Sequence, residues 1–121
     1  MPPIYKLCST PDWQTCLRTG VLPWSLVDTD DGFIHLSAPH QAQATAAKHF
    51  HHRPDLVLLE IDPARLPEGA LRWEVSRGGD LFPHLYADLP ATAVLRATPA
   101  PLDENGVPHL DLPPPSSSRE P

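Results

Sequence analysis

The sequence predicts an α+β domain in which two helices pack on a mixed or antiparallel sheet. Segments with strand and helix signals follow one another as strand, helix, strand, helix and then three more strands. The later strands are joined by connections too short for crossover helices, which parallel neighbours would require. These two observations exclude an all-parallel sheet and favour the α+β class.

The first quarter of the chain predicts a strand followed by a helix. Residues 4–8 alternate as a short strand, with Lys6 on the same face as its apolar neighbours Ile4 and Cys8. Residues 10–12 combine a capping hydroxyl, a proline and an acid, which is typical of a helix start, and Gly20 is placed to end that helix. Residues 21–29 are predicted to be irregular, with Trp24 as an anchor.

A turn signal at residues 30–32 leads into a second predicted strand, residues 32–37. Alternation places Phe33, His35 and Ser37 on one face of this strand. Ser37 is also placed to cap a second helix, which runs to about residue 52. Apolar side chains at helical spacing predict that this helix packs closely on the sheet: Ala42, Ala46 and Phe50.

The apolar run at residues 56–61 predicts a central strand that is covered on both faces. One helical turn is predicted at residues 62–66 and a last strand at residues 93–98. Together these segments predict a single domain over residues 1–110. Residues 111–121 have the Pro- and Ser-rich composition of a disordered tail.

Charge and hydropathy limit the classes of partner. Nine basic and fifteen acidic residues give a net charge of −6, so general binding to nucleic acid through charge is not expected. The chain opens without a signal-peptide pattern, and no apolar run approaches the ~20 residues that span a bilayer. We therefore expect a cytoplasmic protein without a membrane partner, in which Cys8 and Cys16 are reduced thiols.

Residues 71–86 concentrate most of the groups able to bind or react. Alternation along a strand from residue 71 predicts a buried face with Leu71, Trp73 and Val75. The opposite face then carries the polar side chains of this strand: Arg72, Glu74 and Ser76. This pattern predicts half of a polar pocket.

The loop after that strand is predicted to complete the half-pocket. Arg77 leads into Gly78 and Gly79, where the backbone turns with positive φ at little cost. The loop is expected to end at residues 82–83 and to present two further polar side chains beside the strand: His84 and Tyr86.

Several segments resemble one bacterial family, known as domain of unknown function 952, over residues 4–108. The segments are Tyr5-Lys6-Leu7, Asp31-Gly32-Phe33-Ile34-His35-Leu36-Ser37, Gln41, Leu58-Leu59, Trp73-Glu74-x-Ser76-Arg77-Gly78-Gly79 and Phe82-Pro83-His84-Leu85-Tyr86. That family is grouped by fold with ADP-ribosyltransferases and RNA 2′-phosphotransferases, which use NAD. The resemblance therefore implies an ADP-ribosyltransferase-like fold and NAD as a possible cofactor.

The likeness to the NAD-using group rests on three places. Residues 4–7, followed by a helix and Gly20-Val21-Leu22, look like its opening pattern. Ile34-His35-Leu36-Ser37 before an alanine-rich helix resembles a segment of the phosphotransferases, and Phe82-Pro83-His84-Leu85 stands where the group has a pocket-lining stretch. Tyr5 and Lys6 depart from the pattern, because many transferases carry a histidine or arginine there. These departures favour inheritance of the fold over inheritance of the activity.

Each candidate residue has a structural alternative. His35 is either a buried histidine satisfied by the backbone or a ligand contact. Glu74 is either the partner of a neighbouring arginine or a group that binds a ribose hydroxyl and stabilises an oxocarbenium-like transition state. Residues 77–79 form either a hairpin turn or a small phosphate site.

A metal site is not expected from the sequence. His49, His51 and His52 lie close together, but no cysteine or carboxylate is spaced to complete a set of three or four ligands.

The pocket is predicted to accept a small nucleotide-like ligand, NAD or a 2′-phosphorylated relative. The candidate catalytic residues are Glu74, His35 and His84. The candidate ligand-binding residues are Ser37, Arg72, Ser76, Arg77, Gly78, Gly79 and Tyr86. Two other functions stay open: a non-catalytic ligand-binding module and a protein-interaction module on the same fold.

Overall fold

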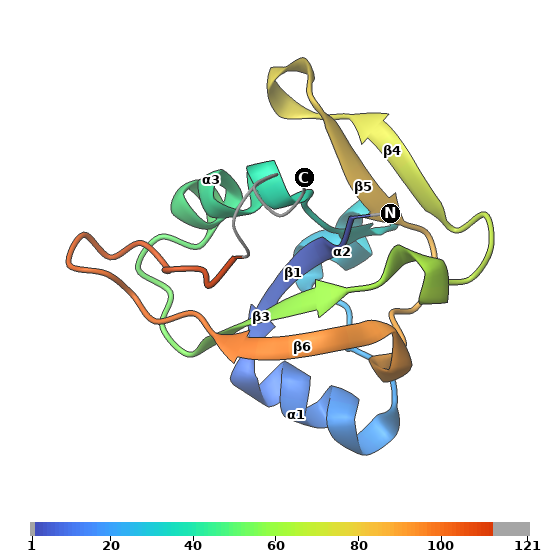
Figure 1. Cartoon of the computed structure of the whole chain (residues 1–121), viewed down its shortest axis with the longest axis horizontal. Coiled ribbons are helices and arrows are strands. Elements are labelled where there is room, and N and C mark those ends of the chain that lie inside the picture. Colours follow the sequence, from blue (N-terminus) through green and yellow to red (C-terminus); the bar gives the residue numbers. More distant parts are fainter. Residues whose placement is uncertain (1, 113–121) are drawn as a thin grey trace, which may run out of the picture.

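The computed structural model describes residues 2–112, apart from the side chain of Arg77. The predicted tail at residues 111–121 lies, from residue 113 onward, outside the described residues. The fold is α+β, as the sequence predicts, but its strands form two antiparallel sheets rather than one (Figure 1). The elements in chain order are β1 (Ile4–Ser9), α1 (Thr10–Thr19), α2 (Leu26–Asp31), β2 (Ile34–His35), α3 (Pro39–His49), β3 (Leu56–Ile61), η1 (Pro63–Arg65), β4 (Leu71–Val75), η2 (Arg77–Gly79), β5 (Leu81–Leu85), η3 (Ala91–Ala93) and β6 (Val94–Pro99).

The first sheet has the order β1-β3-β6, with β3 in the centre. Both faces of β3 are covered, as its continuous apolar run predicts, and Figure 1 shows α1 and α3 on opposite sides of the sheet. On the α1 side, Leu59 and Ile61 pack in a core that includes Cys16. On the α3 side, Leu58 packs with Ala42 and the other members of a second core.

The second sheet has the order β2-β5-β4 and carries the candidate site. A pair of backbone hydrogen bonds ties it to the first sheet: the N–H of Tyr5 donates to the carbonyl of Ser37 (2.8 Å), and the N–H of Ser37 donates to the carbonyl of Tyr5 (2.9 Å). In Figure 1 the β4–β5 hairpin lies at the opposite end of the molecule from α1.

The starts of α1 and α3 and the end of α3 differ from the predicted bounds. Ser9, not Thr10, caps α1, because its hydroxyl accepts the N–H of Asp12 (3.2 Å). Gly20 ends α1 as predicted, with φ 91°. The cap of α3 is Ala38 rather than Ser37, and the helix ends at residue 49 rather than 52.

The prediction of an irregular segment at residues 21–29 was wrong in part, because α2 begins at Leu26. Ser25 caps this helix by accepting the N–H of Asp28 (3.1 Å). Leu26 and Val27 are exposed and the buried side chain is an aspartate, so the apolar spacing that reveals most helices is missing. Trp24 does act as an anchor, packing against the core and donating its indole N–H to Asp88 (2.8 Å).

The predicted buried face of β4 was also wrong. Trp73 and Val75 are 46% and 68% exposed, because β4 is the outer strand of the second sheet and only its first residue, Leu71, packs against the core. Phe82 and Pro83 do not end a loop but belong to β5, where Pro83 pairs with Trp73. The strand predicted at residues 32–37 is shorter, since only residues 34–35 are extended in the sheet.

Candidate functional site

One face of the second sheet gathers six side chains from all three of its strands or from residues next to them. We call them the polar face: Phe33, His35, Arg72, Glu74, His84 and Tyr86. The strand register builds this face, because His35 and Arg72 are both direct neighbours of His84, one on each side. Residues two apart on a strand share a face, so Glu74 and Tyr86 join the same set.

Glu74 is the acid of the polar face, and two side chains of that face bind it. Its Oε1 accepts the Nδ1–H of His84 (2.8 Å) and the hydroxyl of Tyr86 (2.7 Å). The hydrogen bond of Tyr86, followed by that of His84, holds the pKa of Glu74 below its usual value. The bond to Glu74 in turn raises the pKa of Tyr86. Glu74 is therefore a fixed, ionised carboxylate.

The two members of the Glu74–His84 pair differ in access. The side chain of Glu74 is 37% exposed, whereas that of His84 is 7% exposed. Phe33 stacks on the His84 ring with centroids 4.0 Å apart. The buried His84 therefore orients Glu74 through its hydrogen bond, and the more exposed Glu74 is the member of the pair that a ligand would contact.

His35 is held by a buried ion pair between Lys6 and Asp28. Its Nδ1 lies 2.7 Å from Oδ1 of Asp28, and its backbone N–H donates to the same oxygen (3.0 Å). The other oxygen of Asp28 accepts a hydrogen bond from Nζ of Lys6 (2.8 Å). On the outer side, Nε2 of His35 lies 2.9 Å from Oδ2 of Asp31.

Asp28 stays ionised in spite of its burial. Loss of solvation acts to raise its pKa, but the hydrogen bonds of His35 and the charge and hydrogen bond of Lys6 outweigh it and leave the pKa well below its ordinary value. An ionised acid at this position fixes both the orientation of the His35 ring and the proton on its Nδ1.

Aromatic rings complete the polar face. The ring of Phe33 lies 4.6 Å from that of His35 and 5.2 Å from that of Tyr86, centroid to centroid. The guanidinium of Arg72 lies over the Tyr86 ring at 5.1 Å. The face therefore combines a carboxylate, two imidazoles and a guanidinium around a small aromatic surface.

The structure brings together five of the residues predicted for the site: His35, Arg72, Glu74, His84 and Tyr86. Ser37 lies apart from them, since its hydroxyl donates to Thr45 (3.3 Å). Ser76, Gly78 and Gly79 lie at the exposed tip of the β4–β5 hairpin, and the side chain of Arg77 lies outside the described part of the chain.

The groups that hold His35, namely Lys6, Asp28 and Asp31, were not among the predicted site residues. Asp28 falls in the segment that was predicted to be irregular, and Asp31 was interpreted as part of a turn and of a family-like segment but not as a site residue. A signal for Lys6 was present, because a lysine among the apolar residues of one strand face needs a buried acid as its partner. The partner itself lies 22 residues away and has no local signature.

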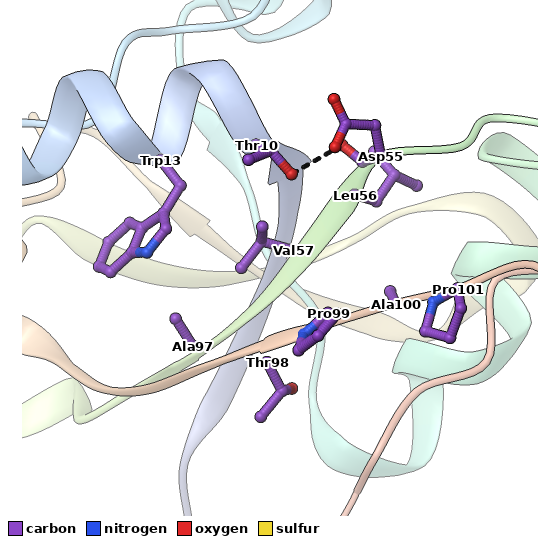
Figure 2. A pocket seen from close by; sticks show the side chains of 10 residues that line it. All are labelled: Thr10, Trp13, Asp55, Leu56, Val57, Ala97, Thr98, Pro99, Ala100 and Pro101. Atoms are coloured by element: carbon purple, nitrogen blue, oxygen red, sulfur yellow. Dashed lines mark hydrogen bonds between the residues drawn. The ribbon is translucent and has the colours of Figure 1, made fainter.

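No residue of the polar face lines either of the two described hollows of the surface. One, of about 430 Å³, lies beside β6 and is lined by Thr10, Trp13, Asp55, Leu56, Val57, Ala97, Thr98, Pro99, Ala100 and Pro101 (Figure 2). The other, of about 450 Å³, lies between η1 and the start of β4. The polar face is thus an open surface rather than part of either hollow.

Residues 2–112 contain neither a metal-ligating cluster nor a helix that could cross a membrane. No group of three His, Cys, Asp or Glu side chains in this range has an arrangement that could hold a metal ion. No helix in this range has the length and hydropathy needed to cross a bilayer. Cys8 and Cys16 are both buried free thiols.

Comparison with known proteins gives a family and a set of solved structures. A family profile described as "Protein of unknown function (DUF952)" matches residues 7–97. The crystal structure of protein CC0527 from Caulobacter crescentus is similar, with a TM-score of 0.84 and 48% identity over 89% of this chain and 94% of that chain. The solution NMR structure of CC0527 gives a TM-score of 0.77 and 48% identity over 89% and 92% of the two chains. No curated protein matches the chain.

Proposed function

The chain belongs to the DUF952 family, and we propose that it binds a small nucleotide-like ligand, NAD or a 2′-phosphorylated relative, on its polar face. The chemistry proposed for this ligand is ADP-ribosyl or phosphate transfer. We also propose that the fold is ADP-ribosyltransferase-like, on the basis of the sequence resemblance described above.

The observation that carries this proposal is the state of Glu74. Its Oε1 is fixed by two hydrogen bonds, and no hydrogen bond to its Oε2 is seen among the side chains that the structure describes. A fixed, ionised carboxylate suits two tasks: to accept hydrogen bonds from ribose hydroxyls and to stabilise positive charge. Cleavage of NAD needs the second task, because charge develops on the ribose as the glycosidic bond breaks and its electron pair leaves with nicotinamide.

The groups around Glu74 match other parts of a nucleotide. Phe33 and Tyr86 offer aromatic surface for a planar ring. Arg72 and His35 flank them with groups that donate hydrogen bonds to phosphate oxygens. The polar face thus has a partner for the base, the ribose and the phosphates of one ligand.

Thermal shift measurements with NAD, ADP-ribose, nicotinamide and 2′-phosphorylated nucleotides test the proposal. A ligand at 100 times its Kd should add about 2.7 kcal/mol to the stability of the folded chain. We expect Glu74→Gln to weaken this effect and Glu104→Gln, an exposed change of equal charge, to leave it intact. A panel in which no member stabilises the chain would exclude the proposed function.

A measurement of product formation distinguishes an enzyme from a non-catalytic binding module. An enzyme releases nicotinamide or transfers phosphate, and Glu74→Gln abolishes that product. A non-catalytic module shows the stabilisation alone.

A protein-interaction module is the second candidate, because the opposite side of the same hairpin exposes Trp73, Val75 and Leu81. If the chain is a protein-interaction module, Val75→Ser weakens binding of the protein partner, whereas Glu74→Gln leaves that binding unchanged.

A further inference from the structure

We infer that Nε2 of His35 is the phosphate-binding group of the polar face, and that the carboxylate of Asp31 occupies its place until a ligand phosphate displaces it. The inference rests on the proposed function and deepens it by naming the residue that holds the phosphate. The sequence had instead suggested residues 77–79 as the phosphate site, and the inference differs from that prediction.

His35 has an acidic oxygen beside each ring nitrogen. Oδ1 of Asp28 lies 2.7 Å from Nδ1, and Oδ2 of Asp31 lies 2.9 Å from Nε2. An ionised carboxylate only accepts hydrogen bonds, so both contacts are satisfied when each nitrogen carries a proton. In that state His35 is a cation with one N–H directed to the outside of the molecule.

The two acids differ in how firmly they are held. The side chain of Asp28 is 2% exposed and also binds Lys6, so it is part of the permanent structure. The side chain of Asp31 is 50% exposed, and His35 is the one polar partner of this side chain among the described residues. Asp31 is also the last residue of α2, where a negative charge is disfavoured by the helix dipole. An exposed pair of this kind contributes little stability, so its exchange for a ligand anion costs little.

The charges around His35 favour such an exchange. The groups that face it are Asp28 and Asp31 from α2, Lys6 from β1, Arg72, Glu74, His84 and Tyr86. The carboxylates of Asp28, Asp31 and Glu74 and the cations of Lys6 and Arg72 surround the ring. If Asp31 turns away, one negative charge leaves the surroundings of Nε2, and a phosphate oxygen takes its place as the acceptor.

The glycine turn offers less to a phosphate. The N–H of Gly79 already donates to the carbonyl of Ser76 (3.1 Å). A Cβ built on Gly78 or Gly79 would meet no atom within 4 Å, so neither glycine lies against a wall that could enclose an anion. Their positive φ values, 74° and 80°, explain the glycines as turn residues.

NMR of the imidazole nitrogens during titration with inorganic pyrophosphate tests the inference. We expect the Nε2 signal of His35 to shift, and Asp31→Asn to tighten pyrophosphate binding about two- to fivefold, because the competing carboxylate is removed. Asp30→Asn is the matched control, since it makes the same charge change at an exposed neighbour, and we expect wild-type affinity from it. His35→Gln should lose most of the binding.

Three results would overturn the inference: equal affinities of Asp31→Asn and Asp30→Asn, unchanged binding in His35→Gln, or acetate binding as tightly as pyrophosphate. The outcome is independent of the nucleotide test. If NAD binds through Glu74 but is insensitive to Asp31→Asn and His35→Gln, the proposed function stands and the inference fails. If pyrophosphate binds through His35 but no nucleotide binds, the inference stands and the proposed function fails.

Discussion

Lys6 and Asp28 form a buried ion pair that links the first sheet to the candidate site. Lys6 comes from β1 and Asp28 from the first turn of α2, and Asp28 also holds His35. Removing charges from water is costly, so such a pair is seldom the most stable choice for a core. Its value here is orientation, because it fixes the ring of a half-exposed histidine.

Lys6→Met is predicted to destabilise the fold by about 3–5 kcal/mol, since it leaves Asp28 buried without its main counter-charge. Urea unfolding at neutral pH measures this loss. Lys48→Met removes an exposed lysine and should change the stability by less than about 0.5 kcal/mol. Equal effects of the two variants would show that the buried pair is not a structural requirement.

Asp28 also predicts a pH dependence. Because its folded pKa lies below its usual value of 3.8, the unfolded chain takes up the proton first as the pH falls. Its contribution to stability is therefore complete above about pH 5 and is lost as the pH drops below about 4.

The measurement for Asp28 is the free energy of urea unfolding between pH 7 and pH 3. We expect the difference between wild type and Asp28→Asn to be constant in the upper half of this range and to shrink in the lower half. A difference that does not change with pH would show that the ionised form of Asp28 does not stabilise the fold.

Among the strands and helices, local sequence patterns were sufficient to predict some features and not others. The alternation of β4 was predicted correctly, and it places Arg72 and Glu74 on one face and Trp73 and Val75 on the other. Which face is covered was not predictable from the same pattern, because it depends on what packs against the sheet. Helix α2 was missed for a related reason, since its buried side chain is charged.

The β4–β5 hairpin is held to the start of α3 by Gln41. The side-chain N–H groups of this buried residue donate to Asp80 (2.8 Å) and to the carbonyl of Leu81 (2.6 Å), while its Oε1 accepts the N–H of Ala38 (2.9 Å). This contact joins two segments about 40 residues apart and fixes the position of the hairpin.

Gln41→Ala is therefore predicted to destabilise the hairpin by about 1–3 kcal/mol through loss of these bonds. Native-state hydrogen exchange should show faster exchange in β5 than in the wild type and little change in β3. Gln43→Ala, on the same helix, provides the comparison, because its side chain bonds to Pro108 and Leu110 instead. Faster exchange in both variants would remove the special role of Gln41.

At the scale of the whole molecule, the sequence predicted the class and most element positions but not the division into two sheets. That division depends on the register between β1 and the segment after β2, where Tyr5 meets Ser37, and no local pattern encodes a pairing over 32 residues. The grouping of candidate residues on one face was predictable where it depends on alternation within one strand, as for Arg72 and Glu74. It was not predictable where long-range packing supplies the partner, as for Lys6 and Asp28.

The proposed function requires that a ligand binds at the polar face rather than at another surface. Backbone amide shifts during titration with NAD test it most directly. We expect shifts at residues 33–35, 72–74 and 84–86, and we expect Glu74→Gln to abolish them. Shifts confined to the hollow around Trp13 and Pro99, or no shifts at saturating NAD, would contradict it.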